Sequence, residues 1–136
     1  MYETFDHTAD VGLRVTAPDL PGLFAEAARG LLSLLVEDMG VVEPSAELRI
    51  RLEEKDLAYL LFDWLRELLY LYDARHFLVG VCEVKIENGV LQATIHGEAC
   101  DIARHCLAHE VKAITSHGLF VRQEGEGYTA EFIVDV

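Results

Sequence analysis

Two aspartates near opposite ends of the chain are the residues whose chemistry best suits a metal ion. Asp10 lies in residues 5–12, FDHTADVG, a predicted bend between two strands, and Asp135 follows the last apolar stretch. Carboxylate and carbonyl oxygens are the ligands of Ca²⁺, Mg²⁺ and Mn²⁺, and these ions need several donors from separate parts of the chain. Each aspartate therefore has two interpretations: a metal ligand, or an acceptor of backbone N–H groups, which is the commoner role.

Lys112 is the second candidate. It lies in residues 111–117, VKAITSH, where apolar and polar side chains alternate as they do in a strand. A strand lysine commonly faces solvent, and the alternative is that it contacts a partner or pairs with a carboxylate. The sequence leaves both interpretations open.

Residues 100–109, CDIARHCLAH, gather two thiols and two imidazoles and raise the question of a zinc site. Structural zinc sites favour cysteine pairs two to four residues apart with a second pair elsewhere, whereas Cys100 and Cys106 are more widely spaced and Cys82 stands alone. A nucleophilic cysteine would need a lowered pKa and a cleft. We therefore expect incidental, reduced thiols in a cytoplasmic protein.

The sequence lacks the motifs of several other enzyme classes. The sequence contains no Gly-x-Gly-x-x-Gly, no phosphate-binding Gly-x-x-x-x-Gly-Lys-Ser/Thr and no Gly-x-Ser-x-Gly elbow. A small metal-dependent hydrolase built on Asp10 and Asp135 is one further hypothesis, but no general base or substrate pocket can be named for it.

Composition narrows the choice of partners. The 136 residues, 51% of them hydrophobic, suit one domain over 1–136. A formal net charge of −13 disfavours direct, stable nucleic-acid binding. The acidity serves solubility or attracts a cationic partner or metal ion. The longest apolar stretch, residues 31–36, is far too short to span a membrane.

Two helices are predicted to carry the core. Apolar residues from Leu20 to Leu35 recur at spacings of three and one, and Asp19 suits the N-cap. A second stripe runs from Leu57 to about Tyr72 behind Asp56, another suitable N-cap. A loop is expected at 38–44.

Alternating or β-branched segments predict strands at 2–16 (two strands with a bend), 46–52, 78–86, 90–95, 111–121 and 128–134. Asn88-Gly89 is a strong hairpin signal, and residues 124–127, EGEG, supply a second turn. The order lacks a regular strand-helix-strand alternation, so we predict an α+β fold with two helices packed on a largely antiparallel sheet.

The chain resembles the archease family in four places: residues 2–12 (YETFDHTADVG), 64–70 (WLRELLY), 110–115 (EVKAIT) and the terminal Asp135 and Val136. These segments occur in the family's order across the whole chain. The resemblance implies the archease fold, which agrees with the α+β fold predicted above.

The resemblance also implies a function. Archeases assist the RtcB-type RNA-splicing ligase, which seals tRNA exon halves that bear a 2′,3′-cyclic phosphate or a 3′ phosphate. They promote guanylylation of the ligase histidine, raise turnover and can broaden nucleotide use. On this view the chain is an activator rather than an enzyme.

Carried over residue by residue, the family's metal site corresponds to Asp10, Asp135 and the backbone carbonyl or terminal group of Val136, with Ca²⁺ as the expected ion and Mg²⁺ or Mn²⁺ as alternatives. Lys112 and His7 become candidate contacts to the ligase or its nucleotide. The alternative function is a general protein-binding or chaperone-like module without metal dependence.

Overall fold

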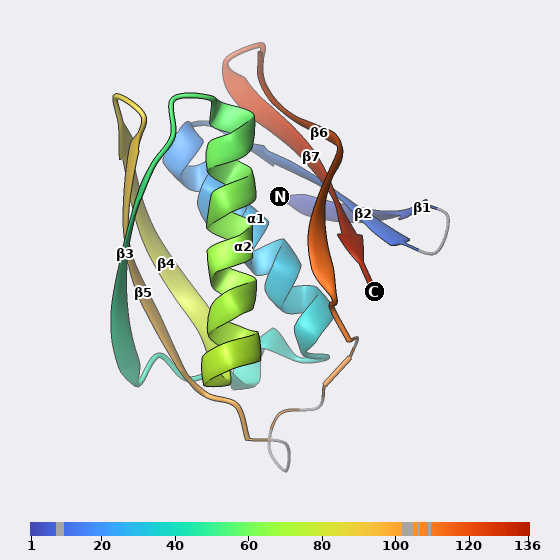
Figure 1. Cartoon of the computed structure of the whole chain (residues 1–136), viewed down its shortest axis with the longest axis vertical. Coiled ribbons are helices and arrows are strands. Elements are labelled where there is room, and N and C mark those ends of the chain that lie inside the picture. The colour runs from blue at the N-terminus through green and yellow to red at the C-terminus, as the bar shows by residue number, and fades with distance from the viewer. Residues whose placement is uncertain (8–9, 102–104, 106, 109) are drawn as a thin grey trace.

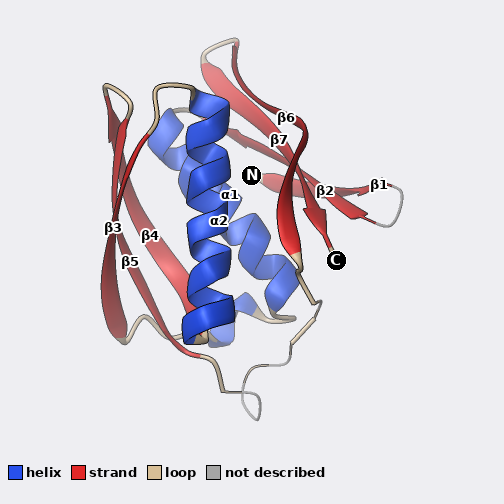
Figure 2. Ribbon diagram, viewed as in Figure 1, coloured by secondary structure: helices blue, strands red, loops and turns tan. Residues whose placement is uncertain are grey.

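The computed structural model describes residues 1–7, 10–101, 105, 107–108 and 110–136. Within them, two helices lie between two antiparallel sheets (Figures 1 and 2). The elements in chain order are β1 (Tyr2–His7), β2 (Asp10–Ala17), α1 (Leu20–Leu35), the short 3₁₀-helix η1 (Met39–Val41), β3 (Ala46–Glu53), α2 (Leu57–Arg75), β4 (Phe77–Glu87), β5 (Val90–Ala99), β6 (Ala113–Glu124) and β7 (Gly127–Asp135).

Both predicted helix starts are confirmed. The Asp19 carboxylate accepts the Gly22 N–H, and the Asp56 carboxylate accepts two N–H groups in the first turn of α2. These bonds satisfy donors that have no partner inside the helix. The second helix runs beyond the predicted Tyr72 because the left-handed residue that ends it is His76. No helix in the described part of the chain is long and apolar enough to cross a membrane.

The α+β class with antiparallel pairing is confirmed, but the expected single sheet is divided in two. One sheet has the order β1-β2-β7-β6 and the other β3-β5-β4. We call them the large and the small sheet. The physical reason is that the helices are apolar on more than one side: α1 contacts β2 and β4, and α2 contacts β6, β4 and β3, so each helix packs against both sheets.

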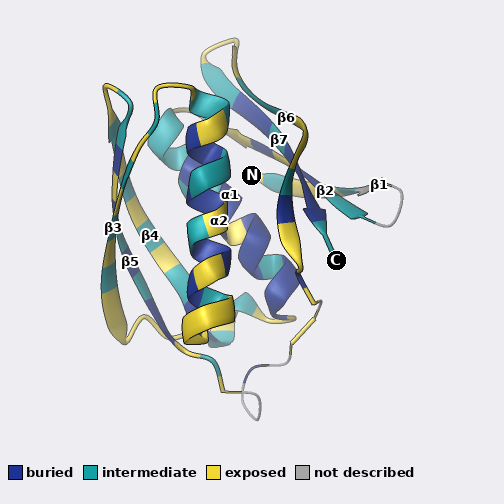
Figure 3. Cartoon of the chain, in the orientation of Figure 1, coloured by how far each residue is buried: buried dark blue, intermediate teal, exposed yellow. Residues whose placement is uncertain are grey.

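The core fills the space between the sheets, where the buried faces of the helices meet (Figure 3). Trp64 and Phe24 are fully buried at the contact of the two helices, and the Trp64 indole N–H donates to the Phe24 carbonyl at 2.9 Å. This bond satisfies the polar atom of the largest core side chain. This bond therefore links the two helices directly to each other.

Both predicted hairpins are present. Asn88 and Gly89 have φ values of 50° and 76°, the left-handed geometry that a two-residue turn requires, and they join Glu87 to its register partner Val90. Gly125 plays a similar part between β6 and β7. The strands are longer than predicted, because pairing extends to flanking residues that lack a hydrophobic pattern.

Candidate functional site

One face of the large sheet points away from the helices. In β2, Leu13 and Val15 are fully buried against the helices. Gly12, Arg14 and Thr16 alternate with them along the strand and therefore point outward. Residues directly opposite one another on neighbouring strands share a face. We call the outward side chains of β1, β2, β7 and β6 the large-sheet face.

Predicted site residues meet at one end of this face. Asp10 pairs in register with Asp135 on β7, His7 pairs with Asp10, and Ala113 pairs with Asp135. A single row of register partners therefore crosses all four strands and consists of His7, Asp10, Asp135 and Ala113. We call it the carboxylate row. The two aspartates, 125 positions apart in sequence, are direct cross-strand neighbours, and both are partly buried.

Lys112 and Val136 lie one residue beyond this row. The Lys112 N–H donates to the Asp135 carbonyl at 2.8 Å, and Val136 follows β7 directly. The prediction that Lys112 lies within a strand is wrong, because β6 begins at Ala113. Its side chain is exposed. It borders a hollow of about 560 Å³ that is also lined by Tyr72, Asp73, Leu107, Ala108, Glu110 and Val111.

The carboxylate row suits a hard cation. Like charges directly opposite one another destabilise a sheet, and a divalent ion between Asp10 and Asp135 would convert that repulsion into ligation by oxygen. The described residues contain no group of three or more His, Cys, Asp or Glu side chains placed to hold a metal. Donors beyond the two carboxylates would therefore include a backbone or terminal oxygen such as that of Val136.

The large-sheet face also carries an aromatic residue that the sequence did not indicate as functional. A Cβ on Gly12 would collide with the ring of Phe5, its register partner, so the glycine of the FDHTADVG motif lets this ring lie against the sheet. Arg14 lies 5.8 Å from the ring centroid. The sequence feature that could have indicated this contact is a glycine inside a strand, because such a glycine marks the close approach of another group.

Arg14 anchors the next row. Its Nε donates to Glu131 at 2.9 Å and its Nη1 to Glu3 at 3.0 Å, which links β1, β2 and β7. The hydrogen bonds that Arg14 donates to these two carboxylates, with Glu131 the larger contribution, raise the pKa of Arg14 above its ordinary value. This row links three strands on the same face as the carboxylate row, and the row of Phe5 and Gly12 lies between the two.

The described cysteines are not activated. Burial raises the pKa of the Cys82 thiol to about 12, and burial together with the nearby Asp101 carboxylate raises the pKa of Cys100. Both thiols are therefore protonated at neutral pH, which disfavours nucleophilic and metal-binding roles. Cys106 and His109 lie outside the described residues.

His105 in the same segment is fully buried. Its Nδ1 accepts the Asp101 N–H at 2.8 Å, and its Nε2 lies 3.3 Å from a carboxylate oxygen of Glu98. The contact between Nε2 and the carboxylate does not have hydrogen-bond geometry. This histidine holds the connection between β5 and β6 to the small sheet.

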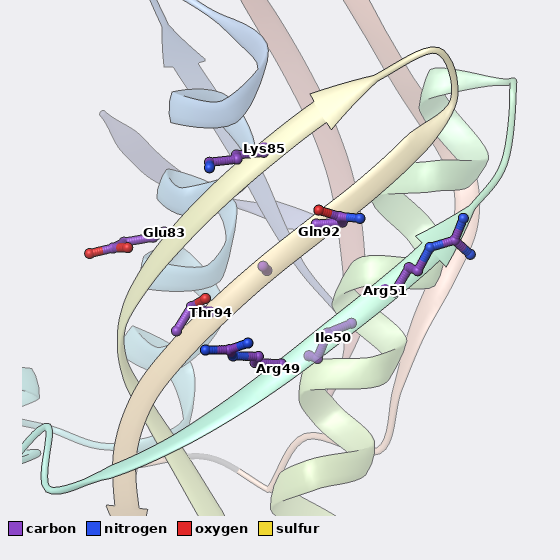
Figure 4. Close-up of a pocket in the computed structure, with 8 residues that line it drawn as sticks. Arg49, Ile50, Arg51, Glu83, Lys85, Gln92 and Thr94 are labelled. Atoms are coloured by element: carbon purple, nitrogen blue, oxygen red, sulfur yellow. The ribbon is translucent and has the colours of Figure 1, made fainter.

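The outer side of the small sheet has a different character (Figure 4). A shallow groove of about 380 Å³ has Gln92 and Thr94 of β5 along its floor and Arg49, Arg51, Glu83 and Lys85 along its sides. Arg51 pairs with Glu53 on its own strand, and Arg49 lies 3.8 Å from Glu47. Mixed, exposed ion pairs of this kind are typical of a solvated sheet surface.

Comparison with known proteins places the chain in a family. Residues 2–136 match the model of the Archease protein family. "Protein archease" of Methanopyrus kandleri is 37% identical over 139 residues, covering 99% of both chains. That of Pyrococcus furiosus is 34% identical over 140 residues, covering 99% of this chain and 98% of its own.

Two solved structures share the fold of this chain. The solution structure of Methanobacterium thermoautotrophicum protein 1598 superimposes with a TM-score of 0.83 at 30% identity, covering 99% of this chain and 98% of its own. The crystal structure of a Thermotoga maritima archease has a TM-score of 0.68 at 20% identity over 100% of this chain and 98% of its own, a likeness of fold. The family match and these relatives extend over essentially the whole chain, and this protein belongs to the archease family.

Proposed function

We propose that this protein is an accessory activator of an RtcB-type RNA-splicing ligase, promoting guanylylation of the ligase histidine and multiple turnover, and able to broaden nucleotide use. Family membership across residues 2–136 carries the proposal. The register that joins Asp10 to Asp135 beside Lys112 supports it, because these are the residues that the resemblance marks. The covalent chemistry resides in the ligase, and this chain is not itself an enzyme.

The carboxylate row is the proposed metal site. Asp10, Asp135 and an oxygen of Val136 would hold Ca²⁺, with Mg²⁺ or Mn²⁺ as alternatives. A bound divalent cation supplies positive charge that can align anionic phosphate groups. The chain's own part is to fix two carboxylates on neighbouring central strands, which keeps their separation constant.

Lys112 and His7 are the proposed contacts to the ligase or its nucleotide. Lys112 is exposed beside the carboxylate row, and His7 ends β1 as the register partner of Asp10. A lysine ammonium is a point charge suited to a phosphate group.

The test is multiple-turnover ligation by the cognate ligase with GTP and excess RNA. We expect stimulation by the wild-type protein and loss of stimulation, at least tenfold, in Asp10→Ala and Asp135→Ala. Glu83→Ala is the matched control, because this carboxylate lies on the outer side of the other sheet and should stimulate as wild type does. Ligase turnover unchanged by the wild-type protein would overturn the activator role.

A chaperone-like function is the second candidate, because the Thermotoga maritima relative is described as an "archease, possible chaperone". This function requires neither metal nor carboxylates. Suppression of aggregation of several unrelated proteins, equally by wild type and by Asp10→Ala, would favour it. Activity restricted to the ligase would exclude it.

A further inference from the structure

The large-sheet face combines an aromatic ring with more carboxylates than guanidinium groups. The Phe5 ring is only partly buried, and it lies over Gly12 in the row next to the carboxylate row. Ile133 shares that row and is only 6% exposed, although its neighbours in β7 point toward the helices. An apolar strip with a ring at its edge therefore adjoins the paired aspartates.

A second aromatic residue lies across the sheet from the first. Phe120 on the edge strand β6 pairs in register with Glu131 and so points outward. The Arg122 guanidinium lies 4.4 Å from its ring centroid, and Arg14 covers the ring of Phe5. Both edge strands of the large sheet thus present a phenylalanine next to an arginine, a composition typical of interface hot spots.

Carboxylates dominate the charge of this face. Two outward guanidinium groups stand among five outward carboxylates: Arg14 pairs with Glu3 and Glu131, Arg122 pairs with Glu124, and Asp10 and Asp135 belong to the carboxylate row. A surface of this kind attracts a cationic partner and repels an RNA strand at long range. Proteins that bind RNA carry the complementary positive surface.

From this chemistry we infer that the large-sheet face is the docking surface for the protein partner, with Phe5 as its apolar anchor and the surrounding carboxylates facing cationic side chains. The inference rests on the proposed function, which identifies that partner as the RNA ligase. Docking through this face brings the carboxylate row to the ligase, since this row occupies one end of the same face. The outer side of the small sheet faces solvent in the complex.

The first test separates docking from activation. Affinity for the cognate ligase is measured by calorimetry without RNA, and activation is measured as a function of concentration of this protein. Phe5→Ala should raise both the dissociation constant and the half-maximal concentration at least tenfold while leaving maximal activation unchanged. The matched control is Phe62→Ala on α2, where Arg66 lies 5.3 Å from the ring centroid; it should change either value less than twofold.

A charge-reversal pair keeps the inference testable if Phe5→Ala fails to fold. Glu3 and Glu47 have side chains 48% and 50% exposed, and they lie on the outer sides of the large and the small sheet. Glu3→Lys should slow association with the ligase at least threefold at low salt, and the difference should vanish at about 0.5 M salt. Glu47→Lys should leave the rate close to that of wild type.

The outcomes are distinguishable. Equal effects of Glu3→Lys and Glu47→Lys, or wild-type affinity in folded Phe5→Ala, would overturn the docking surface while leaving the activator role intact. Loss of self-association in Phe5→Ala with unchanged ligase affinity would also overturn it, by assigning the face to a second copy of this chain. Binding that depends on Phe5 without any activation would support the surface and overturn the proposed function.

Discussion

The outer sides of the two sheets have the same architecture and different chemistry. Each is the exposed face of an antiparallel sheet whose other face packs on the helices. On the small sheet the central strand offers Gln92 and Thr94, flanked by charged side chains of both signs. On the large sheet the central strands oppose Asp10 to Asp135 and place a glycine beneath Phe5.

The two sheets differ in how closely their cross-strand pairs follow the preferences that stabilise a sheet. Cross-strand neighbours on the small sheet avoid like charges, since Arg49 opposes Thr94 and Arg51 opposes Gln92. The large sheet places two carboxylates directly opposite each other, which weakens a sheet. A departure of this kind at one end of one face is typical of a functional site.

The largest expected effect concerns the glycines of the two central strands. A Cβ at Gly97 in the small sheet would collide with the backbone carbonyl of Leu78 on β4, whereas at Gly12 it would collide with the Phe5 side chain. A backbone carbonyl in a sheet cannot move aside, but a ring can. We expect Gly97→Ala to lower the free energy of unfolding by about 3 kcal/mol or more and Gly12→Ala by about 1 kcal/mol.

Urea unfolding of both variants measures this difference. Gly12→Ala should also weaken binding to the ligase to the same degree as Phe5→Ala, because the added methyl group displaces the Phe5 ring from its position over residue 12. Equal destabilisation by the two alanines would contradict the assignment of Phe5 as a movable side chain over Gly12.

The next effect concerns the carboxylates of the two faces. Ca²⁺ at a hundred times its dissociation constant should stabilise the wild-type protein by about 2.7 kcal/mol, as any ligand specific to the folded state does. Asp135→Asn should abolish this gain and, in chelator, raise stability by about 0.5 kcal/mol, since it removes the like-charge pair with Asp10. Thermal melts with Ca²⁺ and with chelator measure both effects.

Glu83→Gln on the small sheet is the control for this experiment. It changes charge equally but opposes Thr94 rather than a carboxylate, so the Ca²⁺ effect should persist. A full Ca²⁺ response in Asp135→Asn would exclude Asp135 from the metal site.

Local patterns were sufficient to predict the elements. Both helix caps, the Leu20–Leu35 helix and the Asn88-Gly89 hairpin depend on residues within a few positions of one another, and each is confirmed. The division into two sheets is not visible in such patterns, because β2 pairs with β7 across most of the chain. An apolar stripe shows that a helix is buried, but not that two separate sheets bury it.

The site could be predicted only in part for the same reason. Residue types indicated Asp10, Asp135 and Lys112 as candidates, and the resemblance added His7 and Val136, but neither revealed that the two aspartates are register partners. The contact between Phe5 and Gly12 depends on the register of β1 on β2. A shift of one residue would move every one of these side chains to the opposite face.

A smaller effect is expected for the lysines of the two regions. Lys112→Gln should lower maximal activation of the ligase about tenfold, because it removes the exposed ammonium group proposed to contact the ligase or its nucleotide. Lys85→Gln is the matched control, an exposed lysine on the outer side of the small sheet. Maximal rates at saturating concentration of each variant measure the difference. Equal losses in both variants would show that general charge, rather than position, matters.

The smallest effect is a pH dependence that belongs to the large-sheet face. Hydrogen bonds from Arg122 and, less strongly, from Thr129 hold the pKa of Glu124 below its ordinary value of 4.5. A lowered pKa in the folded state contributes stability above the ordinary value, and this contribution disappears as pH falls through the lowered value. The wild-type protein should therefore lose more thermal stability between pH 5 and about pH 3 than Arg122→Gln does, whereas Arg51→Gln on the small sheet should follow wild type. Parallel pH profiles for wild type and Arg122→Gln would show that this pair makes no contribution to stability.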